Sequence, residues 1–183
     1  NSIFRANTEQ LLRNVQELIA EGQFRIGSFY VNKGSFRAGA NRLQAMSDHY
    51  PLFSKADATL WTLGLTYENL GDNFEEQQVE SYQSIVRDYP LSPYVEQAKE
   101  RLTAMSRAIP ESDPDRFDMH KYNVENRVYR GRKGSFWGMF SGSPHLGIAA
   151  KTGDPMMTTL MPRTPPGIRR SADVAAGTAP SAE

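Results

Sequence analysis

The chain has 183 residues, 39% of them hydrophobic, and its 21 basic side chains balance 21 acidic ones. This balance removes any bulk electrostatic argument for binding nucleic acid or an anionic membrane. The sequence contains no cysteine, which excludes a disulfide framework, a thiolate zinc site and a cysteine nucleophile. Its apolar runs are only a few residues long, too short to span a bilayer.

The composition changes near Pro110 and predicts two regions. Residues 1–109 carry helix formers with apolar residues at helical spacing, and we expect a helical domain there. Residues 110–183 are rich in Pro, Gly, Ser and Thr, and we expect a largely disordered tail that contains a basic and aromatic segment at 125–140. The first residue is Asn1 rather than Met, which suggests a processed chain or a fragment.

Three helices are expected in the first 50 residues. The first is predicted to start with a cap at Thr8 and to end at Gly22. The second runs from Phe24 to a turn in which Gly34 suits the left-handed conformation, and the third is stopped by Pro51. The apolar positions of the first helix are Leu11, Leu12, Val15, Leu18 and Ile19.

Three more helices are expected before residue 110. Ser54 is predicted to cap the fourth, with Asp57 in a capping-box arrangement, and Gly71 closes it. The fifth is stopped by Pro90, and the Ser-Pro pair at 92–93 opens the sixth. The last helix has a charged outer face, which is typical of a terminal capping helix.

The helices form a repeat. Gly27 and Gly64 lie 37 residues apart, whereas Pro51 and Pro90 lie 39 residues apart, so an insertion is expected near "DNFEE" in the second unit. This spacing is close to the 34-residue helix–turn–helix unit of tetratricopeptide proteins. We therefore predict an all-α fold of tetratricopeptide-type repeats, an α-solenoid, with the small glycines where helices touch. The alternative is a helical bundle with coincidental prolines.

The sequence offers no sign of catalysis. The three histidines, His49, His120 and His145, are far apart and lack metal-ligand spacing. No nucleophile elbow, P-loop or dinucleotide fingerprint is present. We expect a non-enzymatic protein without metal or cofactor.

Four residues are candidate contacts for a protein partner. Phe24 and Trp61 occupy equivalent places in the two units and could anchor a partner in the groove, although burial between repeats is the alternative. Arg37 and Arg42 lie on the polar side of the third helix and could form bidentate contacts with a partner's carboxylates. The alternative for these two arginines is a solvated face.

The tail holds a second candidate site, in the stretch "ENRVYRGRKGSFWGMF". Basic residues followed by aromatic ones can bind RNA, an anionic lipid surface or a protein groove. We favour a segment that docks on protein, and the remainder of the tail is expected to be a spacer. The residues expected to dock are Arg130, Arg132, Phe136, Trp137 and Phe140, with Arg127 beside them.

The stretch "QELIAEGQFRIGSFYVNKGSFRAGANRLQAMSDHYP" resembles the C-terminal half of BamD-type outer-membrane assembly lipoproteins. A second stretch, "YQSIVRDYPLSPYVEQAKERL", is also similar, and the resemblance covers about residues 14–106. The family's lipid-bearing cysteine and first repeats do not occur in this sequence, and the tail from residue 110 is not a general family feature. The matching elements are Phe29-Tyr30, Gly34, Ala40-Asn41-Arg42, Met46 and Tyr50-Pro51.

The resemblance implies a scaffold at the periplasmic face of the outer membrane, in the complex that assembles β-barrel proteins. It implies binding to the periplasmic modules of the barrel subunit BamA and to other subunits, with Arg42 on the face used for BamA. Membrane contact would come only through an N-terminal lipid anchor, and no nucleic acid is expected. The alternatives are another tetratricopeptide adaptor of the cell envelope or cytoplasm, and a nucleic-acid or membrane binder acting through residues 127–140.

Overall fold

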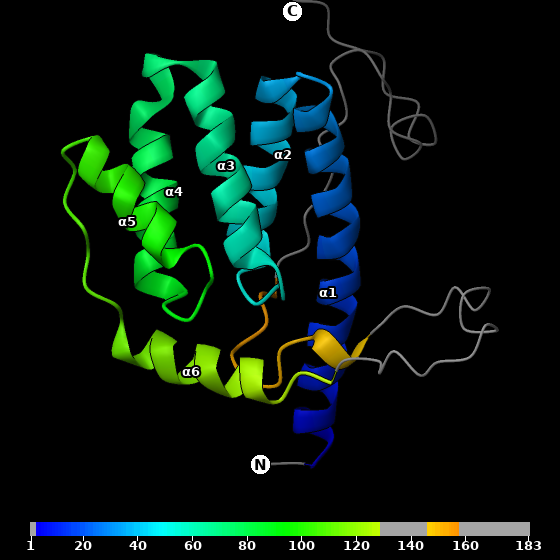
Figure 1. The fold of residues 1–183 in the computed structure, drawn as a ribbon. Coiled ribbons are helices and arrows are strands. Elements are labelled where there is room, and N and C mark those ends of the chain that lie inside the picture. The colour runs from blue at the N-terminus through cyan, green and yellow to red at the C-terminus, as the bar shows by residue number, and fades with distance from the viewer. Residues whose placement is uncertain (1–2, 129–145, 158–183) are drawn as a thin grey trace, which may run out of the picture.

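The structure is a computed structural model that describes residues 3–128 and 146–157 (Figure 1). This part of the chain is helical and contains no strand, so the predicted all-α repeat fold is confirmed. The helices are α1 Ile3–Asn32, α2 Phe36–His49, α3 Ala56–Leu70, α4 Glu75–Asp88, α5 Val95–Ala104 and α6 Pro114–Glu125, with short 3-10 helices η1 Asp72–Phe74 and η3 Leu146–Ile148.

The first two helices predicted from the sequence form a single helix, α1. α1 runs without a break for 30 residues, and Gly22 lies in its interior. A mid-helix glycine is less favourable than alanine by about 1 kcal/mol, too little to end a helix that packs along its length. Thr8 is not a cap either, since its hydroxyl donates to the carbonyl of Phe4 inside the helix.

The two glycines that define the repeat lie at helix contacts, as predicted. A Cβ atom on Gly27 would lie 2.5 Å from Leu43 on α2, and one on Gly64 would lie closer still to Tyr82 on α4. Gly27 and Gly64 are 37 residues apart, and their partners Leu43 and Tyr82 are 39 apart. One of the two extra residues extends α3 past its glycine and the other lengthens the connection that contains η1, which confirms the insertion expected between the helices of the second unit.

The Tyr-Pro endings join one repeat to the next. Tyr50 and Tyr89 each follow the last residue of a helix, α2 and α4, and each is in a non-helical conformation. The hydroxyl of Tyr89 donates to the carbonyl of Pro51 at 2.8 Å. The end of the second repeat is therefore bonded to the end of the first, which explains why the same ending occurs twice.

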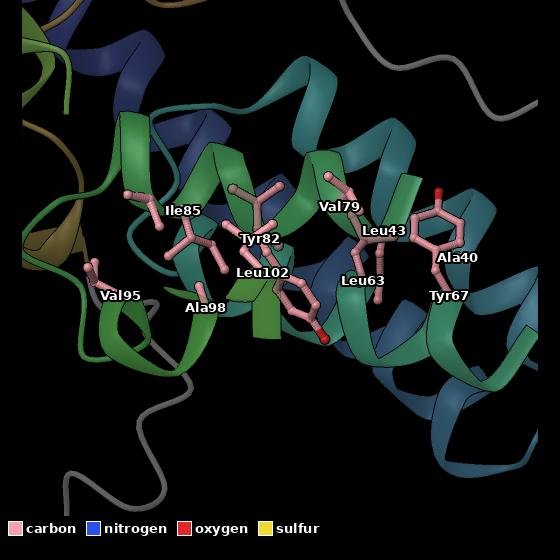
Figure 2. Close-up of a cluster of buried hydrophobic side chains, with 12 residues drawn as sticks. Ala40, Leu43, Leu63, Tyr67, Val79, Tyr82, Ile85, Val95, Ala98 and Leu102 are labelled. Carbon is pink, nitrogen blue, oxygen red and sulfur yellow. The ribbon is translucent and has the colours of Figure 1, made fainter. Parts of the chain in front are cut away.

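Two groups of buried side chains hold the repeats together. The larger group joins α2, α3, α4 and α5, and Tyr82 lies within it with no exposed surface (Figure 2). The smaller group packs Ala20 of α1 against Tyr50 and Phe53 at the end of the first repeat. Phe24 touches both groups and so connects them.

Two helices, α3 and α5, begin later in the chain than predicted. α3 begins at Ala56, after Lys55, because Ser54 donates from its backbone and its hydroxyl to Glu17 of α1 instead of capping. α5 begins at Val95, and the Ser92 hydroxyl accepts from the backbone N–H of Tyr94 in the preceding turn.

Two parts of the region after residue 110 fold onto the repeats, which its composition did not indicate. Asp113 caps α6 by accepting from the backbone N–H groups of residues 115 and 116, and its own N–H donates to the carbonyl of Arg87. Residues 146–157 return to α1 and α6 and bury Ala149 and Ala150 (Figure 1). Composition missed both because a capped helix and main-chain contacts need few large apolar residues.

Candidate protein-docking surface

Arg37 and Arg42 lie on α2 but have different surroundings. Arg42 is half-buried and donates through Nη1 to the side-chain oxygen of Gln23 on α1. Arg37 is exposed, and its guanidinium carbon lies 5.9 Å from the ring centroid of Phe74, the last residue of η1. The structure therefore places Arg42 at the contact between α1 and α2, and Arg37 at the loop of the second repeat.

An exposed basic and aromatic edge lies at the end of α1. Phe29 is 56% exposed, its ring centroid is 6.0 Å from that of Tyr30, and Lys33 Nζ lies 5.8 Å from its centroid. Ile26, one turn earlier, is also exposed. We call Ile26, Phe29, Tyr30 and Lys33 the α1 edge. Aromatic anchors beside positive charges are typical of protein interfaces.

Several apolar positions of the first predicted helix lie on an exposed face of α1. Leu11, Val15 and Leu18, spaced by four and three residues, are all exposed. The buried positions nearby are Glu17 and Ala20. Helical spacing shows that apolar residues share a face but not which face is covered.

Phe24 and Trp61 are packed against the core and only partly exposed. The ring of Phe24 lies 6.0 Å from that of Phe53. Trp61 stacks on Tyr94 with a centroid distance of 5.5 Å and lies 5.4 Å from Tyr82. These contacts agree with the burial alternative. Direct contact of either residue with a partner stays a prediction.

The predicted tail site falls mostly outside the described residues. Arg130, Arg132, Phe136, Trp137 and Phe140 all lie in the range 129–145. Arg127 is described, and it is engaged with the repeats because Nη2 donates to the carbonyl of Ser54 at 3.0 Å. Its Nε is buried without a partner among the described residues.

A buried polar cluster, not foreseen from the sequence, joins α1 to the first repeat's end. Glu17 is 4% exposed and accepts from Ser54, and Arg127 is near enough to stabilise its charge. Burial nevertheless dominates and raises the pKa of Glu17. The sequence indicated this cluster only through the position of Glu17, a carboxylate among the apolar residues of the first predicted helix.

A cleft lies between the end of the first repeat and α6. His120 and Tyr89 line it with their rings edge to face at 5.7 Å. Burial lowers the pKa of His120, whose Nδ1 has no partner in the described part of the chain. The same part shows no group of three His, Asp or Glu side chains arranged to hold a metal.

Comparison with protein families gives one match. The model of the outer membrane lipoprotein family YfiO matches residues 1–81, from α1 into the middle of α4. Searches of curated proteins and of solved structures gave no significant match. In the described ranges, no helix is both long and apolar enough to cross a bilayer. The first 81 residues are thus similar to outer membrane lipoproteins, and they contain Arg37, Arg42 and the α1 edge.

Proposed function

We propose that this chain is a non-enzymatic scaffold subunit of the machinery that assembles β-barrel proteins in the outer membrane. The observation that carries the proposal is the match of residues 1–81 to the outer membrane lipoprotein family. The stacked repeats support it, because such stacks present side-chain surfaces to protein partners. The proposal places the protein at the periplasmic face of the outer membrane, in contact with the periplasmic modules of BamA and with other subunits.

The proposed contact surface consists of Arg42, Arg37 and the α1 edge. Exposed Phe29 and Ile26 supply apolar area that a partner can bury, and the Lys33 ammonium lies beside the Phe29 ring. Arg42 is partly held in place by Gln23, so less side-chain entropy is lost when it meets a carboxylate. Phe24 and Trp61 keep their predicted role as further contacts, through the parts of their rings that remain accessible.

Calorimetric titration of the full chain into the periplasmic part of the cognate BamA tests the proposal. Arg42→Glu should weaken binding by about tenfold, since reversing a charge at an interface costs about 1.4 kcal/mol or more. The matched control is Lys121→Glu, a charge reversal at an exposed position on α6, which should change the Kd less than twofold. Urea unfolding of each variant separates a binding defect from loss of fold. Equal affinity for Arg42→Glu and Lys121→Glu would contradict the proposed surface.

A general tetratricopeptide adaptor of the cell envelope or cytoplasm is the second candidate. It is favoured by the end of the family match at residue 81, which leaves more than half of the chain unmatched. This reading predicts no binding to BamA by any variant. The same titration therefore distinguishes the two functions.

A further inference from the structure

Residues 146–157, with the sequence "LGIAAKTGDPMM", occupy a groove made by three parts of the repeat domain. We call this segment the strap. It lies between α1 and α6, and also contacts the turn that follows α2 (Figure 1). Ala149, Ala150 and Pro155 of the strap are buried. The strap consists mostly of small and polar residues, yet three of its side chains are buried against the rest of the protein.

The wall formed by α1 contacts the main chain of the strap in a fixed register. Gln10 Nε2 donates to the carbonyl of Ala150 at 3.0 Å, and Arg13 Nη1 donates to that of Gly153 at 2.7 Å. Gln16 Nε2 donates to the carbonyl of residue 156. The three donors follow one another at intervals of three residues on α1, and so do the three acceptors on the strap. These bonds depend on the path of the bound backbone and not on its side chains.

The wall formed by α6 uses one buried amide. Asn123 is 7% exposed, and its Oδ1 accepts from the backbone N–H groups of Lys151, at 2.7 Å, and Thr152, at 2.9 Å. Its Nδ2 lies 3.3 Å from the carbonyl of Thr152, to which it donates. A buried amide without partners is unfavourable by about 1–3 kcal/mol, and the strap that covers Asn123 also bonds both polar atoms of its amide.

The floor of the groove selects small residues. Ala149 and Ala150 are buried there, at 0% and 6% exposed. Gly153 has φ +98°, and a Cβ there would lie 2.7 Å from Leu52 and 3.0 Å from the sulfur of Met119. Only glycine avoids both the strained backbone and the clash. With the buried proline, the groove favours the pattern Ala-Ala-x-x-Gly-x-Pro.

We propose that this groove is a binding site for linear peptides, that the strap is its ligand within the same chain, and that a partner protein carrying the same pattern can replace it. The inference is independent of the proposed function. Backbone contacts supply affinity and small-residue pockets supply specificity, as in other peptide-binding domains. Because the strap belongs to the same chain as the groove, it competes with a free ligand as an intramolecular group, at a high effective concentration. A free peptide therefore binds well only where the strap is weakened.

The test uses a fluorescein-labelled peptide of residues 146–157 and fluorescence anisotropy. The full chain with Gly153→Val cannot seat its own strap, while every side chain of the groove is unchanged. This variant should bind the peptide at least tenfold more tightly than the wild-type chain does. A peptide carrying the same Gly-to-Val change should not bind, and Asn123→Ala added to Gly153→Val should abolish binding of the wild-type peptide. The proposal is overturned if the folded Gly153→Val chain binds no more tightly than wild type, or binds both peptides equally.

A second measurement needs no substitution. Millimolar unlabelled peptide added to the isotopically labelled wild-type chain should shift the amide signals of Lys151 and Thr152 towards those of a solvated segment. It should leave the side-chain amide signal of Asn123 in its bound position, since the peptide takes over the same contacts. Unchanged signals of Lys151 and Thr152 at this concentration would also overturn the proposal.

Discussion

The glycines of α1 and α3 give opposite predictions for the same substitution. Gly27→Ala and Gly64→Ala should destabilise the protein, whereas Gly22→Ala should stabilise it. A Cβ on Gly27 would meet Leu43, and one on Gly64 would meet Tyr82, and both of these side chains are 0% exposed. Gly22 is exposed, with nothing within 4 Å of a Cβ.

The magnitudes come from two opposing effects. Replacing a mid-helix glycine by alanine favours the helix by about 1 kcal/mol at each of the three positions. Overpacking opposes this gain by about 1–3 kcal/mol at Gly27 and Gly64, where the neighbours cannot move into free space. The difference between Gly22→Ala and Gly64→Ala cancels the helix-propensity effect, so it should be about 1–3 kcal/mol.

Urea unfolding followed by circular dichroism measures the three free energies of unfolding. At constant m-value, the urea midpoint of Gly22→Ala should lie above that of the wild type. The midpoint of Gly64→Ala should lie below that of Gly22→Ala. Two results would refute the reasoning. One is equal stabilisation by all three substitutions, which would mean that the helices do not touch at the glycines. The other is destabilisation by Gly22→Ala, which would mean that α1 is broken or covered there.

Three further predictions concern the end of the first repeat. Tyr89→Phe removes the bond to the Pro51 carbonyl and should lower the free energy of unfolding by about 1 kcal/mol, with exposed Tyr122→Phe as an unaffected control. Burial raises the pKa of Glu17 above 4.5, so the folded state takes up a proton before the unfolded state does. Wild type should therefore gain stability relative to Glu17→Gln as the pH falls from 7 towards 4.5, and a constant difference across this range would contradict the raised pKa. Burial lowers the pKa of His120 below 6.5, so wild type should lose stability relative to His120→Gln as the pH falls through 6.5, and parallel pH profiles would count against it.

Local patterns were sufficient to predict the repeat and its contacts. The glycines indicate where helices touch, because close packing leaves no room for a Cβ. The Tyr-Pro endings indicate where helices stop, because proline cannot continue a helix. Gly34 and Gly71 have φ of +75° and +88°, as expected for residues that close helices. These features depend on a few atoms of single residues, and the sequence specifies them directly.

Features that depend on distant parts of the chain could not be predicted in this way. The continuity of α1 through Gly22 depends on the packing of α1 against α2. Leu11 and Val15 are exposed because no other described part of the chain packs over them. The strap could not be predicted because Gln10 and Asn123 bind its main chain. Every residue type carries the same main-chain groups, so such bonds leave no pattern in the sequence. Composition therefore indicated low order in a segment that long-range polar contacts hold in place.

Site-specific photo-crosslinking in cells that contain the complete assembly machinery tests the central claim most directly. A benzoylphenylalanine residue replaces Arg42 in one chain, Arg37 in a second and the exposed Lys121 of α6 in a third, and each crosslinked product is identified by mass spectrometry. The account predicts crosslinks from positions 42 and 37 to the periplasmic modules of BamA, and none from position 121. Crosslinks from position 42 only to other proteins, or no more than from position 121, would contradict it.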